Sequence, residues 1–473
     1  MVKIKKIVIS ATLASAALFF GAFPAAAVSP VDVPAAVSAL LVELVSGEVL
    51  YEKNVNERHP ADALARIMTL LLAASACEDD TLDINKPVKM TDSARAGMSS
   101  KSPTLGISSG EDMSLRDLMY CAYISGALEA CNMIAEHISG SVDEFVAKMN
   151  SHARELGCTG TNFTNTYGRY DENQYTTALD QYIIFREAMS LPFFAEISGT
   201  YRYETDKTNK SGSRKLASSN SMLNTGSKYY YGHCVAGAAS VTLEGGYSLV
   251  SQAETDGMSL VCVVLGSDLV TFEDKSTDMR NFSESHRLYE WGFSSFGWRT
   301  VLATSDLVAK TPVRYGDGAD YINLRPESSI RMVLPNDVNI GDFERTVVIY
   351  SAENGETLTA PITAGDALGE VTLTRNGVNY GTVVLVANTN IDLHRMEFVR
   401  TQVTDALGSS VARIVTTVIL LLIVGYIALV IRYNIVRRQR LRKIEERKKE
   451  LIRDRQKQTH TNQETRPNAR HTD

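Results

Sequence analysis

Few residues in this chain have both the types and the spacing that covalent chemistry needs. A serine three residues before a lysine would place a nucleophile and its base on one face of a helix, but none of the lysines has such a serine. Lys210-Ser211-Gly212 puts a cation beside a hydroxyl, yet it lies in a polar loop where a strand is not expected. His59, His137 and His233 stand alone, and we expect structural roles for them. The sequence therefore offers no S-x-x-K pair.

The cysteines and histidines also lack a metal-binding pattern. No C-x-x-C pair occurs, and no histidine spacing suits zinc, so we expect no metal and no cofactor. An even number of cysteines permits disulfides, but most of them lie in apolar helix or strand patterns, which favours buried free thiols. The six are Cys77, Cys121, Cys131, Cys158, Cys234 and Cys262.

The stretch that organises the chain runs from His59 to Ala74. Pro60 stands where a helix could begin, and the apolar run Ile67–Ala74 contains no glycine, so a buried helix entered from a loop is predicted. Asp62 and Arg66 are four residues apart. They could form an ion pair across one helical turn, with a solvated surface pair as the alternative.

The elements around this helix alternate between strands and helices up to about residue 298. A hairpin over residues 39–54 turns at Ser46-Gly47, and residues 259–266 form a short apolar run typical of a buried strand. Helices are predicted at 115–124, 128–138 and 142–156, the first two being separated at Ser125-Gly126. The fold class indicated is α/β, an antiparallel sheet flanked by helices.

Beyond residue 298 the pattern changes to short β segments separated by turns. Residues 299–390 predict a small all-β domain, and residues 391–413 a juxtamembrane connector. Residues 414–431 contain no charge and suffice, with their flanks, to span a bilayer. The tail, residues 432–473, is strongly basic, so the positive-inside rule places it in the cytoplasm.

The N-terminus and the charge distribution define the compartment. Residues 1–27 have three lysines, an apolar run and a small-residue cleavage site, which together predict a secretory signal peptide. Net charges of +3 on residues 1–27 and +8 on residues 432–473 leave about −18 on residues 28–431, because the whole chain carries −7. This acidic exported part argues against nucleic acid as a partner. The basic tail favours the anionic inner leaflet, with a cytoplasmic protein as the alternative.

Several segments, in order, resemble the D-alanyl-D-alanine carboxypeptidases, the low-molecular-mass penicillin-binding proteins of peptidase family S11. His59–Thr69 resembles the segment that carries the family's S-x-x-K motif, and Asp171–Asp180 resembles its D-E-N-H-Y-T-T-A-x-D. Further matches are Leu115–Tyr120, Phe145–Asn150 and Tyr289–Phe293. The resemblance implies a penicillin-binding-protein domain over residues 28–298.

The family's nucleophile and base are absent at the matching positions. Anchored on Ile67-Met68-Thr69, the catalytic serine falls at Ala63 and the lysine at Arg66. Ala63 has no oxygen to attack a carbonyl, and a guanidinium is too basic to accept a proton near neutral pH.

The two other motifs of the family are substituted as well. For S-x-N, one register keeps Ser125 and puts Ala127 where the amide should be, and the ungapped register puts Gly126 and Leu128 there. For K-T-G, the best register gives Val235-Ala236-Gly237, although its spacing to Gly246 is longer than usual. Ser125 itself is expected to bond to the helix backbone rather than to act as a catalyst.

These substitutions predict a pseudoenzyme. We expect a membrane-anchored cell-wall protein, single-pass, with its folded part outside the cytoplasm, acting as a scaffold, regulator or muropeptide sensor. Peptidoglycan or cell-wall proteins are its expected partners. The alternative is an active or residually active serine-type D-Ala-D-Ala carboxypeptidase that trims peptidoglycan stem peptides.

Overall fold

The computed structural model describes residues 31–461, except 34, 80, 96–102, 256, 354 and 409. The predicted signal peptide, residues 1–27, lies outside the described residues. Contacts divide the chain into two compact units. The first comprises residues 1–303, 329–344 and 373–381, and the second residues 304–328, 345–372 and 382–473. The first break falls close to the expected boundary at 298, and the domain limits beyond it stay predictions.

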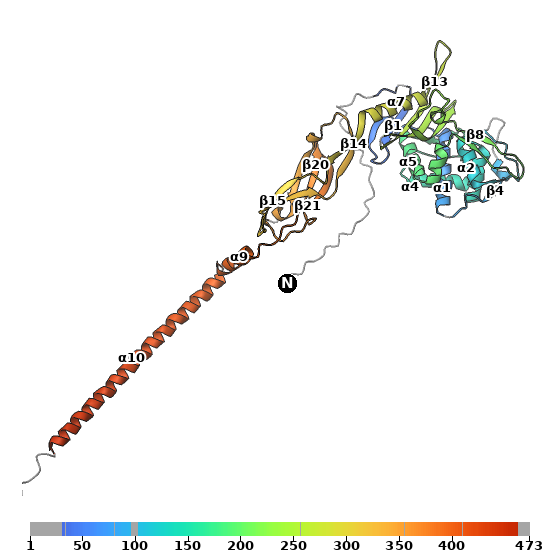
Figure 1. The fold of residues 1–473 in the computed structure, drawn as a ribbon. Helices are drawn as coiled ribbons and strands as arrows, with labels where there is room; N and C mark the ends of the chain where they lie inside the picture. The colour runs from blue at the N-terminus through green and yellow to red at the C-terminus, as the bar shows by residue number, and fades with distance from the viewer. Residues whose placement is uncertain are drawn as a thin grey trace, which may run out of the picture. The chain divides into compact units, whose positions relative to one another are not determined.

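A five-stranded sheet forms the centre of the first unit (Figure 1). Its strands follow the order β2 (Val49–Lys53), β1 (Ser38–Glu43), β11 (Met258–Ser267), β10 (Gly246–Thr255) and β9 (Cys234–Thr242). Every neighbouring pair is antiparallel, which confirms the predicted sheet. The predicted hairpin is β1 and β2, and β9 is an edge strand.

The sheet separates two apolar cores because its side chains alternate between its faces. Leu40 and Val42 of β1 pack in the larger core, whereas Ala39 and Leu41 pack in the smaller one. β11 is buried on both faces, which explains its continuous apolar run.

Helices cover both faces of the sheet. α7 packs on β10 and β11 over the smaller core, and α5 packs on β1 and β11 over the larger one. In Figure 1, α7 lies apart from the group formed by α1, α2, α4 and α5. The helices are α1 (Ala65–Glu78), α2 (Leu115–Ile124), α3 (Leu128–Ser139), α4 (Val142–Glu155), α5 (Ala178–Met189), α6 (Pro192–Gly199) and α7 (Arg280–Ser295).

Short strands and turns connect these helices. They are β3 (His59–Pro60), β4 (Pro87–Lys89), β5 (Asp112–Ser114), β6 (Tyr175–Thr176), β7 (Arg202–Glu204), β8 (Lys215–Ala217), β12 (Leu269–Thr271) and β13 (Thr277–Met279), with 3-10 turns at η1 (Asp62–Leu64), η2 (Ser93–Arg95) and η3 (Ser221–Leu223).

The start of the central helix differs from the prediction. Pro60 does not begin a helix, because it lies in β3 and pairs with Tyr175 of β6. The chain then passes through η1, and α1 begins only at Ala65. Ala63 therefore lies in the 3-10 turn η1, two residues before the first residue of the α-helix that carries Arg66.

The remaining chain is mostly β structure, as predicted. β14 (Phe296–Leu302) pairs with β17 (Ile330–Pro335). A six-stranded sheet follows the order β18 (Glu344–Ile349), β20 (Ala367–Arg375), β21 (Val378–Ala387), β16 (Tyr321–Pro326), β15 (Ala309–Arg314) and β19 (Leu358–Thr359). The short elements η4 (Ile340–Asp342) and α8 (Tyr350–Glu353) complete this region.

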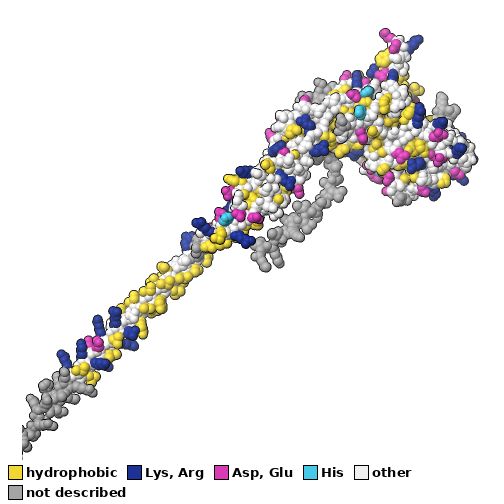
Figure 2. All heavy atoms as spheres, in the orientation of Figure 1, with side chains coloured by type: hydrophobic (Ala, Val, Ile, Leu, Met, Phe, Trp, Pro, Cys, Tyr) yellow, Lys and Arg dark blue, Asp and Glu magenta, His cyan; other side chains and the backbone are white. Residues whose placement is uncertain are grey.

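Two helices end the described chain. α9 (Arg395–Gly408) falls within the expected connector, and α10 (Ser410–Thr461) is continuous. Within α10, Arg413–Arg453 is long and apolar enough to be a candidate membrane span. Figure 2 shows an apolar band along this helix, followed by a segment rich in lysine and arginine. This arrangement agrees with the predicted order of span 414–431 and basic tail.

Candidate functional site

The segment η1 and the first turn of α1 present residues 63 and 66. Ala63 and Arg66 are both partly exposed, whereas their neighbours Leu64 and Ala65 are buried. The buried neighbours fix the turn to the core, whereas the residues at the two predicted site positions keep partial exposure.

The backbone amide of Ala63 is already occupied. It donates a hydrogen bond to the Oγ of Ser240, at 3.2 Å. Ser240 lies on β9 and is buried. In serine acyl transfer the amide of the nucleophile commonly helps to stabilise the oxyanion. Here a side chain of the same protein accepts that hydrogen bond instead.

The Asp62 carboxylate turns toward β9 and away from Arg66. Its Oδ2 accepts a hydrogen bond from Thr242 Oγ1 at 2.6 Å, and its Oδ1 is buried without a partner in the described chain. A Cβ on Gly168 or Gly245 would overlap Asp62 atoms, so both positions need glycine for this approach. Burial raises the pKa of Asp62, the Thr242 hydrogen bond opposes that rise, and the charge of Glu244 adds to it.

The predicted ion pair between Asp62 and Arg66 is wrong. The Arg66 Nε donates to the carbonyl of Ala63 at 2.9 Å, and Nη1 makes a long bond to the carbonyl of Ala122 at 3.5 Å. Within the described residues no carboxylate forms an ion pair with Arg66. The non-helical backbone of Asp62, with φ of 43°, directs its side chain out of the helical register that the i,i+4 rule assumes.

The Arg66 guanidinium lies against the junction of α2 and α3. A Cβ on Gly126 would overlap Nη1, so the guanidinium occupies space that only a glycine leaves open. Burial lowers the pKa of the Arg66 guanidinium, and the neighbouring Cys131 and Tyr123 oppose this effect. An arginine remains cationic all the same.

The predicted second motif lies at this same junction. Ser125 Oγ donates to the carbonyl of Cys121 at 2.6 Å, which confirms its expected bond to the helix backbone. Ala127 is buried at the start of α3, and Leu128 is buried within it. The nearest asparagine along α3 is Asn132. Its amide is engaged with Ala94 and Thr166.

The predicted third motif lies on the edge strand β9. Val235 is exposed, Ala236 is buried, and a Cβ on Gly237 would stand 2.6 Å from the carbonyl oxygen of Val250. Neither of the first two side chains has a polar atom. The structure thus brings the positions of all three motifs into one region, and the one hydroxyl among their side chains, that of Ser125, is bonded to the backbone.

Comparison with known proteins identifies the family. The model of the D-alanyl-D-alanine carboxypeptidases, peptidase S11, matches residues 25–269. The chain belongs to the peptidase S11 family. D-alanyl-D-alanine carboxypeptidase DacF of Bacillus subtilis (strain 168) is 28% identical over 342 residues, which cover 72% of this chain and 82% of the relative. DacC of Escherichia coli (strain K12) is 26% identical and covers 75% and 83% of the two chains.

A solved structure supports the fold of this S11 chain. Penicillin binding protein 5 from Haemophilus influenzae aligns with a TM-score of 0.57 and 24% identity, over 77% of this chain and 99% of that one. The likeness is one of fold, and it extends beyond the segment that the family model matches.

Two residues of the site were missed by sequence reasoning. Ser240 and Thr242 follow the third-motif positions on β9, and their hydroxyls bond to Ala63 and Asp62. The only signal in the sequence was their alternation on one strand, because residues two apart share a face. Their partners, nearly 180 residues away, could not be read from that pattern.

The other sequence candidates lie elsewhere in this S11 domain. Lys210-Ser211-Gly212 lies in the loop between β7 and β8, outside any strand as expected, with Lys210 Nζ bonded to the carbonyl of Ser109. His59 Nε2 lies 2.8 Å from the buried Ser38 Oγ, which fits a structural role. All six cysteines are free thiols, and four of them are buried. The described chain has no group of residues suited to a metal ion.

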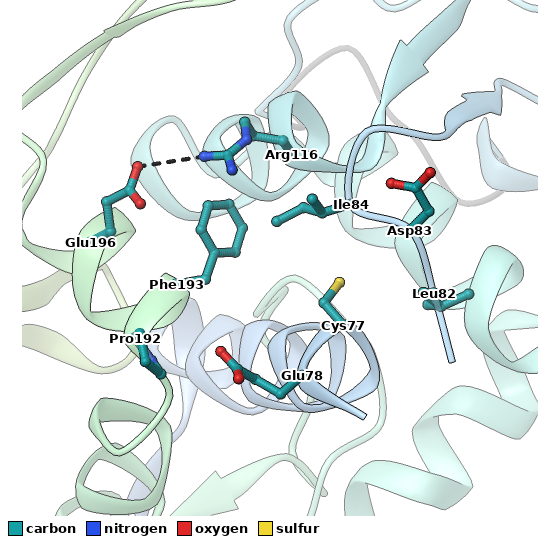
Figure 3. A pocket seen from close by; sticks show the side chains of 9 residues that line it. All are labelled: Cys77, Glu78, Leu82, Asp83, Ile84, Arg116, Pro192, Phe193 and Glu196. Atoms are coloured by element: carbon teal, nitrogen blue, oxygen red, sulfur yellow. Dashed lines mark ion pairs between the residues drawn. The ribbon is translucent and has the colours of Figure 1, made fainter. Parts of the chain in front are cut away.

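A surface pocket of about 620 Å³ lies at the end of α1 (Figure 3). Arg116 lies 4.6 Å from the ring centre of Phe193 and pairs with Glu196 at 3.5 Å. Burial, with Glu78 and Asp83, raises the pKa of the Cys77 thiol, although Arg116 opposes this. Such a thiol is a poor nucleophile.

Proposed function

We propose that this chain is a catalytically inactive member of the S11 family, which acts at the cell wall through binding rather than hydrolysis. The observation that carries the proposal is the environment of residue 63. A methyl group stands at the expected position of the nucleophile, and the amide beside it is bonded to Ser240 Oγ at 3.2 Å. The position therefore lacks both an attacking oxygen and a free oxyanion donor.

The size of the expected effect supports this proposal over the active alternative. Loss of the nucleophile of a serine hydrolase costs on the order of 10⁶ in turnover, and further losses among residues that act together add little. Arg66 cannot serve as the base, because its guanidinium stays protonated. Ser125, the one hydroxyl among the side chains at the three motif positions, donates a hydrogen bond to the backbone carbonyl of Cys121.

Attachment to the membrane is the second part of the proposal. α10 would cross the bilayer with residues 414–431 and continue as a helix into the cytoplasm, so that the S11 domain lies outside. Twelve lysines and arginines against four acidic residues in 432–457 support this orientation. The basic segment would bind the anionic inner leaflet, with a cytoplasmic protein as the sharper alternative.

Acylation by a fluorescent penicillin tests inactivity. The full-length protein in detergent, incubated with the probe and measured by intact mass, should show no adduct. Bacillus subtilis DacF serves as the active reference under the same conditions. A stable adduct on the natural protein would overturn the proposal, and peptide mapping would then identify the nucleophile.

A reverted variant tests the assignment of the three motifs. Ala63→Ser, Arg66→Lys, Ala127→Asn, Val235→Lys and Ala236→Thr restore the side chains that the family pattern requires. Ser240→Ala should be added, because otherwise the Ser240 hydroxyl still occupies the amide of residue 63. We expect a penicillin adduct on this variant. Its absence, with an unchanged circular dichroism spectrum, would show that at least one register is wrong.

A further inference from the structure

The pocket at the C-terminal end of α1 lies away from the positions of the three motifs. Its volume is about 620 Å³, and its lining comes from the end of α1, the chain that follows it, and the first turns of α2 and α6 (Figure 3). α1 has 14 residues. Because an α-helix rises about 1.5 Å per residue, roughly 20 Å separate this pocket from η1. The pocket is therefore distinct from the positions that correspond to the family's catalytic residues.

Apolar side chains form the floor of this pocket. Leu82 and Ile84 are partly buried, and Phe193 is buried beside them. In Figure 3 the side chains of Ile84, Phe193 and Cys77 point toward the middle of the pocket. Such a floor removes the aliphatic part of a ligand from water, and each methylene that it buries should raise the affinity about fourfold.

One side of the pocket has balanced charges. Arg116 pairs with Glu196 at 3.5 Å and lies 4.6 Å from the ring centre of Phe193. Glu196 also accepts a hydrogen bond from the Tyr120 hydroxyl at 2.7 Å. The side chains of Arg116 and Glu196 are 38% and 56% exposed, so this pair lies where a ligand would enter. It sets one positive charge against one negative charge.

The other side carries two exposed carboxylates, those of Glu78 and Asp83. Neither forms an ion pair with another described residue, and Asp83 accepts a hydrogen bond from the amide of Asn85 at 2.9 Å. In Figure 3 the two carboxylates lie on either side of the Cys77 thiol. Burial raises the pKa of this thiol and both carboxylates raise it further, although Arg116 opposes them, so both charges act on the middle of the pocket.

The end of α1 adds to this negative potential. A helix C-terminus carries a partial negative charge that cations stabilise, yet the last turn of α1 contains no basic residue and ends at Glu78. Two helix N-termini border the pocket as well, but their amides contribute little. The amide of Arg116 in α2 donates to the carbonyl of Ile84, and α6 begins with Pro192, which has no amide proton.

We propose that this pocket binds a primary ammonium group on an aliphatic stem. Three carboxylates and one guanidinium line it, which leaves a formal charge of −2. An ammonium is a compact charge with three donors, so it suits two separate carboxylates, whereas the planar guanidinium fork suits the two oxygens of one. The ammonium lies between Glu78 and Asp83, and the stem lies on the apolar floor. This site is independent of whether the chain hydrolyses peptides.

Two sources could supply this chemistry: a small free amine or the side chain of a lysine in a polypeptide. Saturation-transfer NMR of the full-length protein in an uncharged detergent, with the detergent alone as the blank, measures binding of each probe. The probes are methylammonium, n-butylammonium, n-butanol and Nα-acetyl-lysine N-methylamide, at constant ionic strength.

We expect n-butylammonium to bind, and to bind about fourfold more tightly than methylammonium for each further methylene that the floor buries. The uncharged n-butanol should bind at least about threefold more weakly than n-butylammonium, because it forms no ion pair with the carboxylates. Equal binding of the lysine derivative and n-butylammonium would show that a free amine suffices. Binding of the lysine derivative alone would assign the site to polypeptides.

Variants locate the site. Glu78→Gln and Asp83→Asn should each weaken n-butylammonium binding about two- to fivefold, the range for solvent-accessible ion pairs, and the double variant should weaken it more. Glu52→Gln removes an exposed carboxylate of β2 outside the pocket and is the matched control. In the parent, n-butylammonium should also slow the alkylation of Cys77 by iodoacetamide, whereas Cys234, the other partly exposed thiol, should react at an unchanged rate.

Three results would overturn the ammonium site: equal binding of n-butylammonium and n-butanol, equal binding of n-butylammonium by the parent and the folded double variant, or no saturation transfer to any probe. None of them bears on the loss of catalysis. A penicillin adduct would overturn the inactive shell and leave the ammonium site intact.

Discussion

Two arginines of the S11 domain lie in partly or largely buried positions but differ in their hydrogen-bond and ion-pair partners. Arg214 donates from Nη1 and Nη2 to the two oxygens of Glu111, at 2.8 and 3.1 Å. Glu111 is fully buried and also accepts a bond from Thr208. Among the described residues, Arg66 has only backbone carbonyls as hydrogen-bond partners. The first arrangement is a completed structural ion pair, and the second leaves a guanidinium that forms no ion pair with any described residue.

The pKa shifts report the same contrast. Burial by itself would raise the pKa of Glu111, but the hydrogen bonds from Arg214, Ser108 and Thr208 lower it overall. Burial raises the pKa of Asp62, the Thr242 hydrogen bond opposes that rise, and no cation among the described residues forms an ion pair with this carboxylate. The Arg214–Glu111 pair thus neutralises both of its charges, whereas Asp62 and Arg66 each lack an ion-pair partner among the described residues.

Replacing each of the two arginines should reveal the largest difference between them, in the free energy of unfolding. Arg214→Met leaves the buried Glu111 carboxylate unpaired, so we expect a loss of about 3–5 kcal/mol in the free energy of unfolding. Arg66→Met leaves no carboxylate behind, so its effect should stay within about 1 kcal/mol. Urea unfolding of the S11 domain within the full-length protein measures both. Equal losses would show that Arg66 is as well compensated as Arg214.

Two glycines test whether the Arg66 guanidinium fills the space next to residue 126. Gly126 and Gly106 both have positive φ, 68° and 69°, but only at Gly126 would a Cβ overlap the Arg66 guanidinium. Each alanine variant should lose about 1 kcal/mol from backbone strain, and Gly126→Ala should lose up to about 1 kcal/mol more, because the Arg66 guanidinium must shift away from the added methyl group. Urea unfolding of both variants isolates the second contribution. Adding Arg66→Ala to Gly126→Ala should recover it, and no recovery would mean that the guanidinium is not what the methyl group meets.

The sequence predicted the elements better than it predicted the site. Apolar periodicity gave the helix at 115–124 with its observed bounds and placed the β1 and β2 hairpin, because both patterns depend on local spacing. The start of α1 was wrong, since β3 pairing with β6 holds Pro60 in a strand. The absence of a serine at position 63 and of a lysine at position 66 could be read directly from the sequence. The hydroxyls of Ser240 and Thr242 could not, because they reach η1 only through tertiary packing.

The smallest expected effect is the pH dependence that Asp62 contributes. Its pKa is raised in the folded state, so the folded protein binds more protons than the unfolded chain, and this group adds stability as the pH falls through its folded pKa. Asp62→Asn removes that contribution while the side-chain carbonyl can still accept the Thr242 hydrogen bond, and asparagine tolerates the positive φ of this position.

The measurement is the difference in unfolding free energy between the parent and Asp62→Asn, taken in urea from pH 7 down to about pH 4. It should move in favour of the parent as the pH falls, and a difference of one between the folded and unfolded pKa values of Asp62 corresponds to about 1.4 kcal/mol. A movement in the opposite direction would mean that a cation stabilises the Asp62 carboxylate, and the open charge on Arg66 is the first place to look for it.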